Sequence, residues 1–120
     1  MVQFVEDRSC TTQFELGQMF QQSDDKVRDY DQAVKWYTRS AKQGYRRAQH
    51  RLGAMYAKGW GVKRNYIRAY AWCKVAASQH SRRALLKLRK IELKMSPEQI
   101  ITARKLSKQY YQIYVVPFAH

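Results

Sequence analysis

Histidine, cysteine and carboxylate side chains are the groups in this 120-residue chain that could bind a metal ion or act as nucleophile and base. The histidines are His50, His80 and His120, and none is spaced from a nucleophile or an acid in a way that suggests a catalytic triad or a metal site. The cysteines, Cys10 and Cys73, fit no metal-binding or CxxC spacing, and we interpret them as reduced, partly buried thiols. We therefore predict that the chain is not an enzyme, with no catalytic residues and no cofactor.

Carboxylates gather in the first part of the chain, around a predicted loop and helix start, at Asp24, Asp25, Asp29 and Asp31. Such a group could hold a divalent cation, but helix capping and interaction with the helix dipole explain it more simply. The segment Gly59-Trp60-Gly61 resembles half of a phosphate-binding loop, yet the Lys-Ser/Thr pair that would follow is missing. We interpret that segment as a turn and predict no metal site.

Positive charge dominates the rest of the chain. The formal net charge is +14, and the span from Gln32 to Ile91 contains 16 Lys or Arg residues but no Asp or Glu. A surface so unbalanced attracts anionic partners over a Debye length of about 8–10 Å. The candidates are an acidic protein, nucleic acid or an anionic membrane.

Much of this charge falls on one helical stripe that occurs twice. Steps of four, three and four residues place one side of a predicted helix at Arg47, Arg51, Ala54 and Lys58. The positions 36 residues later are Arg83, Lys87, Lys90 and Lys94. A charge run is often only a solvated face, but this one recurs in register without balancing acids. We predict that the partner-binding residues are the cations of both stripes: Arg47, Arg51, Lys58, Arg83, Lys87, Lys90 and Lys94.

A repeat of 36 residues explains why the stripe recurs. A shift of this length places Leu16 on Leu52, Gly17 on Gly53, and Trp36 on Trp72. The identities fall mainly on apolar or small residues, as stacked repeats require. Each unit is predicted to form two helices, and Gly53 leaves a point where a neighbouring helix can approach closely.

Cap residues and aromatic residues complete the predicted helices. Asp29 and Asn65 are suited to cap the second helix of each unit, and Ser96-Pro97-Glu98-Gln99 is typical of a helix start. The aromatic residues that we expect in the core are Tyr30, Trp36, Tyr56, Tyr66 and Trp72. Three others do not occupy matching repeat positions and are candidates for exposed contacts: Tyr45, Trp60 and Tyr114.

The second unit resembles a Sel-one-like repeat, a relative of the tetratricopeptide repeat. The residues that carry the resemblance are Ala48, Leu52, Gly53, Tyr56, Gly59, Gly61, Val62, Asn65, Ala69, Trp72, Ala76 and Ala77. In the first unit, Ser23-Asp24-Asp25 replaces the loop glycines. The resemblance implies an all-α, right-handed solenoid of about three helix-turn-helix repeats, with the first helices lining a concave face. It also implies a role as an adaptor or scaffold.

We expect one repeat domain over residues 1–120. Its predicted parts are repeat one (12–47), repeat two (48–83), a partial repeat with a C-terminal capping helix (84–111) and an apolar tail (112–120). Because an array needs a capped end, we expect the tail to pack on the final helix pair. The alternative is that the tail forms an interface with a partner or a second copy.

The leading functional hypothesis is a protein-interaction module whose basic concave groove binds an acidic protein. A small inhibitor or immunity-type protein is a specialised form of it. The alternative is a nucleic-acid-binding protein that uses the same surface through phosphate contacts. No apolar run approaches the ~18 residues of a membrane span. The first eight residues lack the apolar core of a signal peptide, so a cytoplasmic location is expected.

Overall fold

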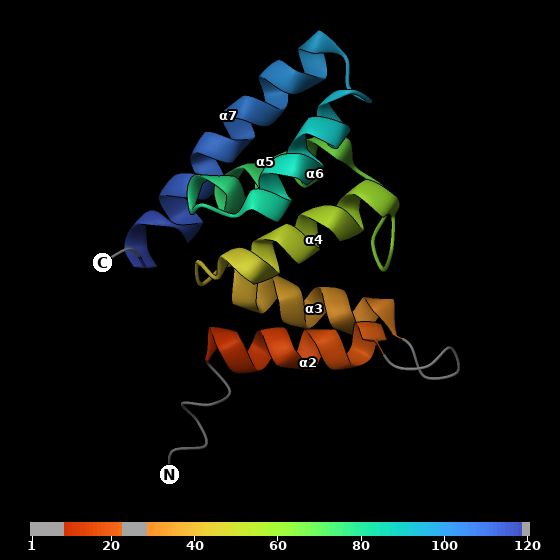
Figure 1. Ribbon diagram of the computed structural model, residues 1–120, viewed down its shortest axis with the longest axis vertical. Coiled ribbons are helices and arrows are strands. Elements are labelled where there is room, and N and C mark those ends of the chain that lie inside the picture. The colour runs from red at the N-terminus through yellow and green to blue at the C-terminus, as the bar shows by residue number, and fades with distance from the viewer. Residues whose placement is uncertain (1–8, 23–28, 119–120) are drawn as a thin grey trace.

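The computed structural model describes residues 9–22 and 29–118, and within these ranges it contains helices and turns but no β-strand. Figure 1 shows the helices stacked along the long axis of the molecule. They are α2 (Cys10–Gln22), α3 (Tyr30–Ala41), α4 (Arg46–Lys58), α5 (Tyr66–Ser78), α6 (Arg82–Glu92), α7 (Pro97–Tyr114) and the short 3-10 helix η1 (Val116–Phe118). The predicted all-α solenoid is confirmed.

Side-chain caps start the helices where the sequence predicts them. Asp29 accepts a hydrogen bond from the amide of Gln32 at 3.0 Å, and Asn65 accepts one from Arg68 at the same distance. Ser96 forms a reciprocal capping box at the start of α7. Asp29 is therefore a helix cap, as expected, whereas Asp24 and Asp25 lie outside the described residues.

Consecutive helices form two stacked hairpins, α2 with α3 and α4 with α5, and α3 packs against α4. In this arrangement α2, α4 and α6 run in the same direction across the molecule (Figure 1). Glycine allows the close approach of the two helices in each hairpin. A Cβ atom at Gly53 would lie 2.5 Å from the Sγ of Cys73 and 3.1 Å from the carbonyl oxygen of Ala69. The predicted close contact at Gly53 is confirmed.

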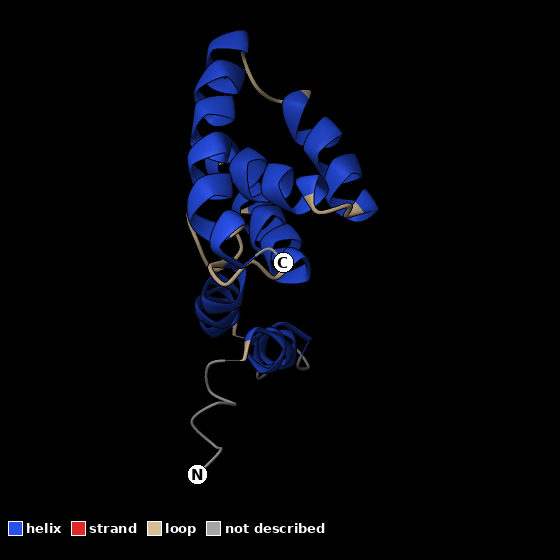
Figure 2. Ribbon diagram, turned by 90° about the vertical axis from the view of Figure 1, so that its left-hand side faces the viewer, coloured by secondary structure: helices blue, strands red, loops and turns tan. Residues whose placement is uncertain are grey.

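The last two helices do not form a third hairpin of the same kind. Helix α7 packs closely against α5, while its backbone stays away from α6. Figure 2 shows α6 and α7 diverging from the loop that joins them. This divergence leaves apolar side chains of α6 and the following turn exposed at Leu85, Leu86 and Leu93.

The C-terminal segment packs on the fold and makes one contact that was not predicted. Helix α7 continues to Tyr114, beyond the expected end of the capping helix at residue 111. Val115 is buried, and a Cβ atom at Gly44 would lie 3.1 Å from the Cβ of Phe118. The segment therefore packs on α7, one member of the final helix pair, and also contacts the turn between α3 and α4, because α7 runs back along α5 toward that turn.

The two repeated tryptophans have different surroundings. Trp72 is only 3% exposed, with the rings of Tyr110 and Tyr114 at centroid distances of 4.6 and 5.2 Å. Trp36 is half-buried beneath the guanidinium of Arg39, so its placement in the core was wrong. The reason is that α7 covers this side of α5, whereas no helix in the described part of the chain does the same for α3.

The aromatic residues expected at the surface are mostly packed. Tyr114 stacks on Trp72, and Tyr45 is half-buried with its ring edge-on to Phe14 at 5.4 Å. Trp60 stacks on Tyr30 at 5.0 Å and is 37% exposed. Of the three, only Trp60 keeps an exposed ring. The repeated tyrosines expected in the core are half-buried at its margins: Tyr30, Tyr56 and Tyr66.

Candidate functional site

The predicted basic residues lie on α4 and α6, except Lys94, which lies in the turn after α6; the two helices are almost free of acids. Helices α4 and α5 contain no Asp or Glu, and α6 contains only Glu92, near its end. Arg51 and Lys87 are half-buried. The other predicted residues are exposed: Arg47, Lys58, Arg83, Lys90 and Lys94. The structure groups these cations into two clefts between α4 and α6.

The first, which we call the arginine cleft, lies at the first turns of α4 and α6 and has a volume of about 70 Å³. It is lined by Phe14, Arg46, Arg47, His50, Arg51, Ser81 and Arg83. The partial positive charge of a helix N-terminus adds to the field of the arginines here. No side chain caps α4, because its N-cap is Tyr45, and its first turn carries no acid.

Three arginines of this cleft are held by neighbouring aromatic and polar groups. Arg46 donates a hydrogen bond to the carbonyl oxygen of Gln79 at 2.7 Å. The guanidinium carbon of Arg47 lies 4.6 Å from the ring centroid of Phe14, and that of Arg51 lies 5.7 Å from it. Arg51 also donates hydrogen bonds to Oε1 of Gln21 at 3.2 Å and to the hydroxyl of Tyr37 at 3.4 Å. Arg51 therefore ties α4 to the first repeat as well as contributing charge to the cleft.

His50 and Arg46 both line the arginine cleft, and neither was predicted from the sequence. Burial, and after it the positive charges of Arg51, Lys87 and Arg83, together lower the pKa of His50 to about 4. The imidazole is consequently neutral at pH 7. The signal that could have revealed it is its spacing of four residues from Arg46, which places a second polar row beside Arg47.

The second cleft, the lysine cleft, lies toward the other ends of the same helices and has a volume of about 120 Å³. Its lining residues are Ala57, Lys58, Tyr66, Lys87, Lys90, Ile91 and Lys94. The pKa of Lys87 is lowered, first by burial and then by the like charges of Lys58, Lys90 and Lys94. Repulsion among uncompensated cations is therefore a property of this cleft, and an anion bound there would relieve it.

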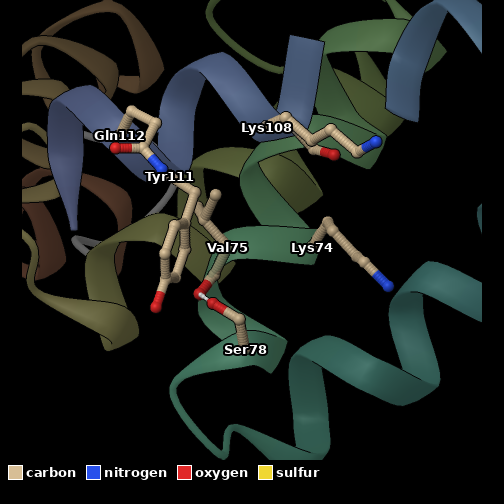
Figure 3. Close-up of a pocket in the computed structure, with 7 residues that line it drawn as sticks. Lys74, Val75, Ser78, Lys108, Tyr111 and Gln112 are labelled. Atoms are coloured by element: carbon tan, nitrogen blue, oxygen red, sulfur yellow. Dashed lines mark hydrogen bonds between the residues drawn. The ribbon is translucent and has the colours of Figure 1, made fainter. Parts of the chain in front are cut away.

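A larger cleft of about 290 Å³ lies between α5 and α7. Figure 3 shows Val75 and Tyr111 side by side in it, with Lys74 and Lys108 extending together away from them. The charges that line it come from those two lysines alone. Because it lacks the repeated cations, this cleft is a weaker candidate than the α4–α6 surface.

The potential metal ligands in the described part of the chain are scattered, not clustered. In residues 9–22 and 29–118, no cluster of three His, Cys, Asp or Glu side chains is arranged to hold a metal ion. Both cysteines are unpaired thiols, and burial raises the pKa of Cys73 to about 12. None of the described helices has the length and apolar character needed to cross a membrane.

Comparison with known protein families gives two consecutive matches to the Sel1 repeat, over residues 12–45 and 46–81. Each match ends two residues before the repeat end that the sequence predicts, which is residue 47 for the first repeat and residue 83 for the second. Comparison with curated proteins gives no match.

Two solved structures have the same architecture. One is a protective antigen of uropathogenic Escherichia coli with an SLR fold, which matches 95% of this chain at a TM-score of 0.88 and 30% identity. The other is a Sel1 repeat protein from Oxalobacter formigenes, which matches 70% of the chain at a TM-score of 0.67 and 32% identity. The match covers 25% and 24% of those proteins, so this chain spans about a quarter of their length.

Proposed function

Because the chain belongs to the Sel1 repeat family, we propose that it is a protein-interaction module that holds an acidic segment of another protein against the basic surface of α4 and α6. Sel1 repeats generally mediate protein–protein interactions. The acidic partner is inferred from charge complementarity, which steers association and suppresses unsuitable partners. Seven cations from two successive repeats line this surface, and a single acid, Glu92, lies on the helices that carry them.

The observation that carries the proposal is the pair of small basic clefts on one α4–α6 seam. Their volumes, about 70 and 120 Å³, are far below the roughly 300–1,000 Å³ typical of pockets that enclose a small molecule. Each is large enough for the end of a single side chain. A protein segment that places carboxylates into such clefts fits this surface better than an enclosed metabolite does.

The test is a charge reversal at exposed positions, because a change at Arg51 would also break its hydrogen bonds to Gln21 and Tyr37. Lys90→Glu with Lys94→Glu alters the lysine cleft alone. We expect this variant to lose binding to a fluorescein-labelled polyglutamate peptide while its circular dichroism is unchanged. Lys35→Glu with Lys42→Glu makes the same charge change at exposed positions of α3 and its end, and should retain most of the binding.

Random-sequence duplex DNA is the competing probe. A phosphate-backbone binder that engages six or more phosphates should lose about a thousandfold or more in affinity between about 50 and 200 mM salt. A protein-segment binder should show a shallower slope, because hydrogen bonds and apolar contacts carry part of its affinity. Submicromolar affinity for the duplex at about 150 mM salt, with no affinity for polyglutamate, would replace our proposal by nucleic-acid binding.

A further inference from the structure

We propose that the arginine cleft and the lysine cleft are two separate subsites that together recognise an extended segment with two acidic side chains about three to five residues apart. This inference rests on the proposed function and adds the spacing of the acids that the partner must carry. It follows from where the two clefts lie on α4 and α6, from the different chemistry of their cations and from their small size.

The two subsites lie at opposite ends of the same pair of helices. The arginine cleft takes residues from the first half of α4 and the start of α6. The lysine cleft takes them from the end of α4, the second half of α6, the turn after α6 and the start of α5. Lys87 lines the lysine cleft, and its charge also acts on His50 in the arginine cleft. The two subsites are therefore neighbours on one continuous surface.

The spacing follows from helix geometry. Arg51 and Lys58 are 7 residues apart on α4, and Arg47 and Lys58 are 11 residues apart. A rise of about 1.5 Å per residue converts these separations to roughly 10 and 16 Å. Arg83 and Lys90 are also 7 residues apart within α6, whereas Lys94 lies in the turn just after this helix. An extended chain advances about 3.3 Å per residue, so acids about three to five residues apart can reach both clefts.

The cations give each subsite its own preference. Guanidinium groups present planar pairs of donors that match the two oxygens of a carboxylate, and Arg47 is already oriented by its contact with Phe14. Ammonium groups act as point charges with little directional preference. The lysine cleft also has an apolar wall formed by Ala57 and Ile91. We therefore expect the arginine cleft to prefer a carboxylate whose two oxygens face the guanidinium groups. The lysine cleft should accept an acidic side chain in any orientation.

An acidic peptide is the occupant that these features favour. Duplex DNA carries one charge per about 1.7 Å of its axis, so it would present phosphates to both clefts whatever their separation. A peptide presents charges only where its sequence has acids. Selectivity for acid spacing is consequently a property that distinguishes a protein segment from nucleic acid at this surface.

The experiment uses the full chain and a set of labelled Gly/Ser peptides. Each peptide carries two glutamates, which are one (adjacent) to eight residues apart in its sequence. Fluorescence anisotropy at low and at physiological salt gives the affinity of each peptide. We expect the affinity to be highest when the glutamates are about three to five residues apart, roughly tenfold above adjacent glutamates, because the second contact then becomes intramolecular.

Two neutralised variants test the subsites separately. Arg47→Gln with Arg83→Gln removes two cations from the arginine cleft, and Lys90→Gln with Lys94→Gln removes two from the lysine cleft. Either variant should bind all the two-glutamate peptides equally and about as weakly as a one-glutamate peptide. A control with the same charge change at exposed positions, Lys35→Gln with Lys42→Gln, should keep the spacing optimum.

The outcomes separate this inference from the proposed function. Binding that depends only on the number of glutamates, or an optimum outside the expected range, would overturn the two-subsite arrangement and leave acidic-segment binding intact. Absence of binding to every peptide, including polyglutamate, would overturn both. Loss of the optimum in the α3 control as well would show that overall charge, and not the two clefts, determines the affinity.

Discussion

The first repeat, α2 with α3, and the second, α4 with α5, use the same internal contacts but carry different outer surfaces. In the first repeat, the amide of Gln43 donates a hydrogen bond to the side-chain oxygen of Gln13. In the second, Gln79 donates to Gln49 in the same way at 2.8 Å. Each of these residues lies 36 positions from its counterpart, so the interior polar contact repeats as faithfully as the apolar ones do.

The outer face of the first helix of each repeat differs in charge. In α2 its residues are Thr11, Glu15, Gln18 and Gln22, and in α4 they are Arg47, Arg51, Ala54 and Lys58. Stacking constrains the shape of the buried positions, because neighbouring repeats must fit against one another. It places no such constraint on exposed positions, which are free to carry the binding chemistry. The contacts that the repeats share therefore determine the fold, and the proposed binding surface lies where the repeats differ.

Replacement of the repeated tryptophan by alanine should give the largest difference in stability loss between the two repeats. Trp72→Ala should lower the free energy of unfolding by about 3–5 kcal/mol, because a buried aromatic side chain is lost and a cavity remains. Trp36→Ala should cost about 1 kcal/mol or less, because that ring is half-buried and lies under Arg39. Urea unfolding followed by circular dichroism measures both values. Equal losses would show that α7 does not provide the cover on Trp72.

Replacement of the glycine at the helix contact should give the next largest loss of stability. Gly53→Ala should destabilise the chain by about 1–3 kcal/mol, because the new methyl group meets Cys73 and the backbone of Ala69. Gly17→Ala should cost less, since the nearest atoms to its methyl group belong to the side chain of Tyr37 and not to the backbone. Thermal unfolding of both variants tests the order. Gly53→Ala combined with Cys73→Ala should recover part of the loss, and no recovery would mean that the backbone contact dominates.

The shared part of the structure was predictable from the sequence because it obeys local and periodic rules. The caps at Asp29, Asn65 and Ser96 and the close contact at Gly53 follow from residue type and repeat position, and each is confirmed. The divergence of α7 from α6 was not predictable in this way. It depends on which surface α7 covers, which is a long-range packing choice that the repeat pattern does not encode.

The candidate site was predictable only in part. Helical spacing placed the seven cations on one surface, but not their division into two clefts. That division depends on contacts from other elements, such as Phe14 on α2 and Tyr66 on α5. Arg51 was predicted as a partner-binding residue, and its hydrogen bond to Gln21 shows that it also joins the repeats. A hydrogen bond between residues that are far apart in the sequence cannot be predicted from the spacing of charged residues.

Acid should expose a further difference between the repeats, because Phe14 in the first repeat corresponds to His50 in the second. The pKa of His50 is about 4 in the fold, against 6.5 for the free side chain. As the pH falls from about 7 to 4, the unfolded chain takes up a proton that the folded chain does not, so stability decreases. After allowance for solvent screening, His50 should account for roughly 1–2 kcal/mol of this decrease.

His50→Gln is the matched variant for this measurement, since it keeps a polar side chain that does not titrate. Urea unfolding at a series of pH values should give a shallower decrease for His50→Gln than for the unmodified chain. The difference between the two curves removes the contribution of the carboxylates, which titrate in both proteins. Parallel curves would show that the pKa of His50 does not change on folding.

The smallest expected effect concerns the turn that ends each hairpin, where Gly44 in the first repeat corresponds to His80 in the second. Both have a positive φ angle, 88° for Gly44 and 72° for His80. This conformation costs a residue with a Cβ atom about 1–3 kcal/mol, whereas glycine adopts it freely but loses more entropy on folding. His80→Gly should therefore raise the free energy of unfolding by about 0.5–1 kcal/mol, and His80→Ala should lower it. Chemical denaturation measures this difference in the free energy of unfolding. A loss of stability in both variants would mean that the contacts of the His80 imidazole stabilise the fold by more than the backbone strain at this position destabilises it.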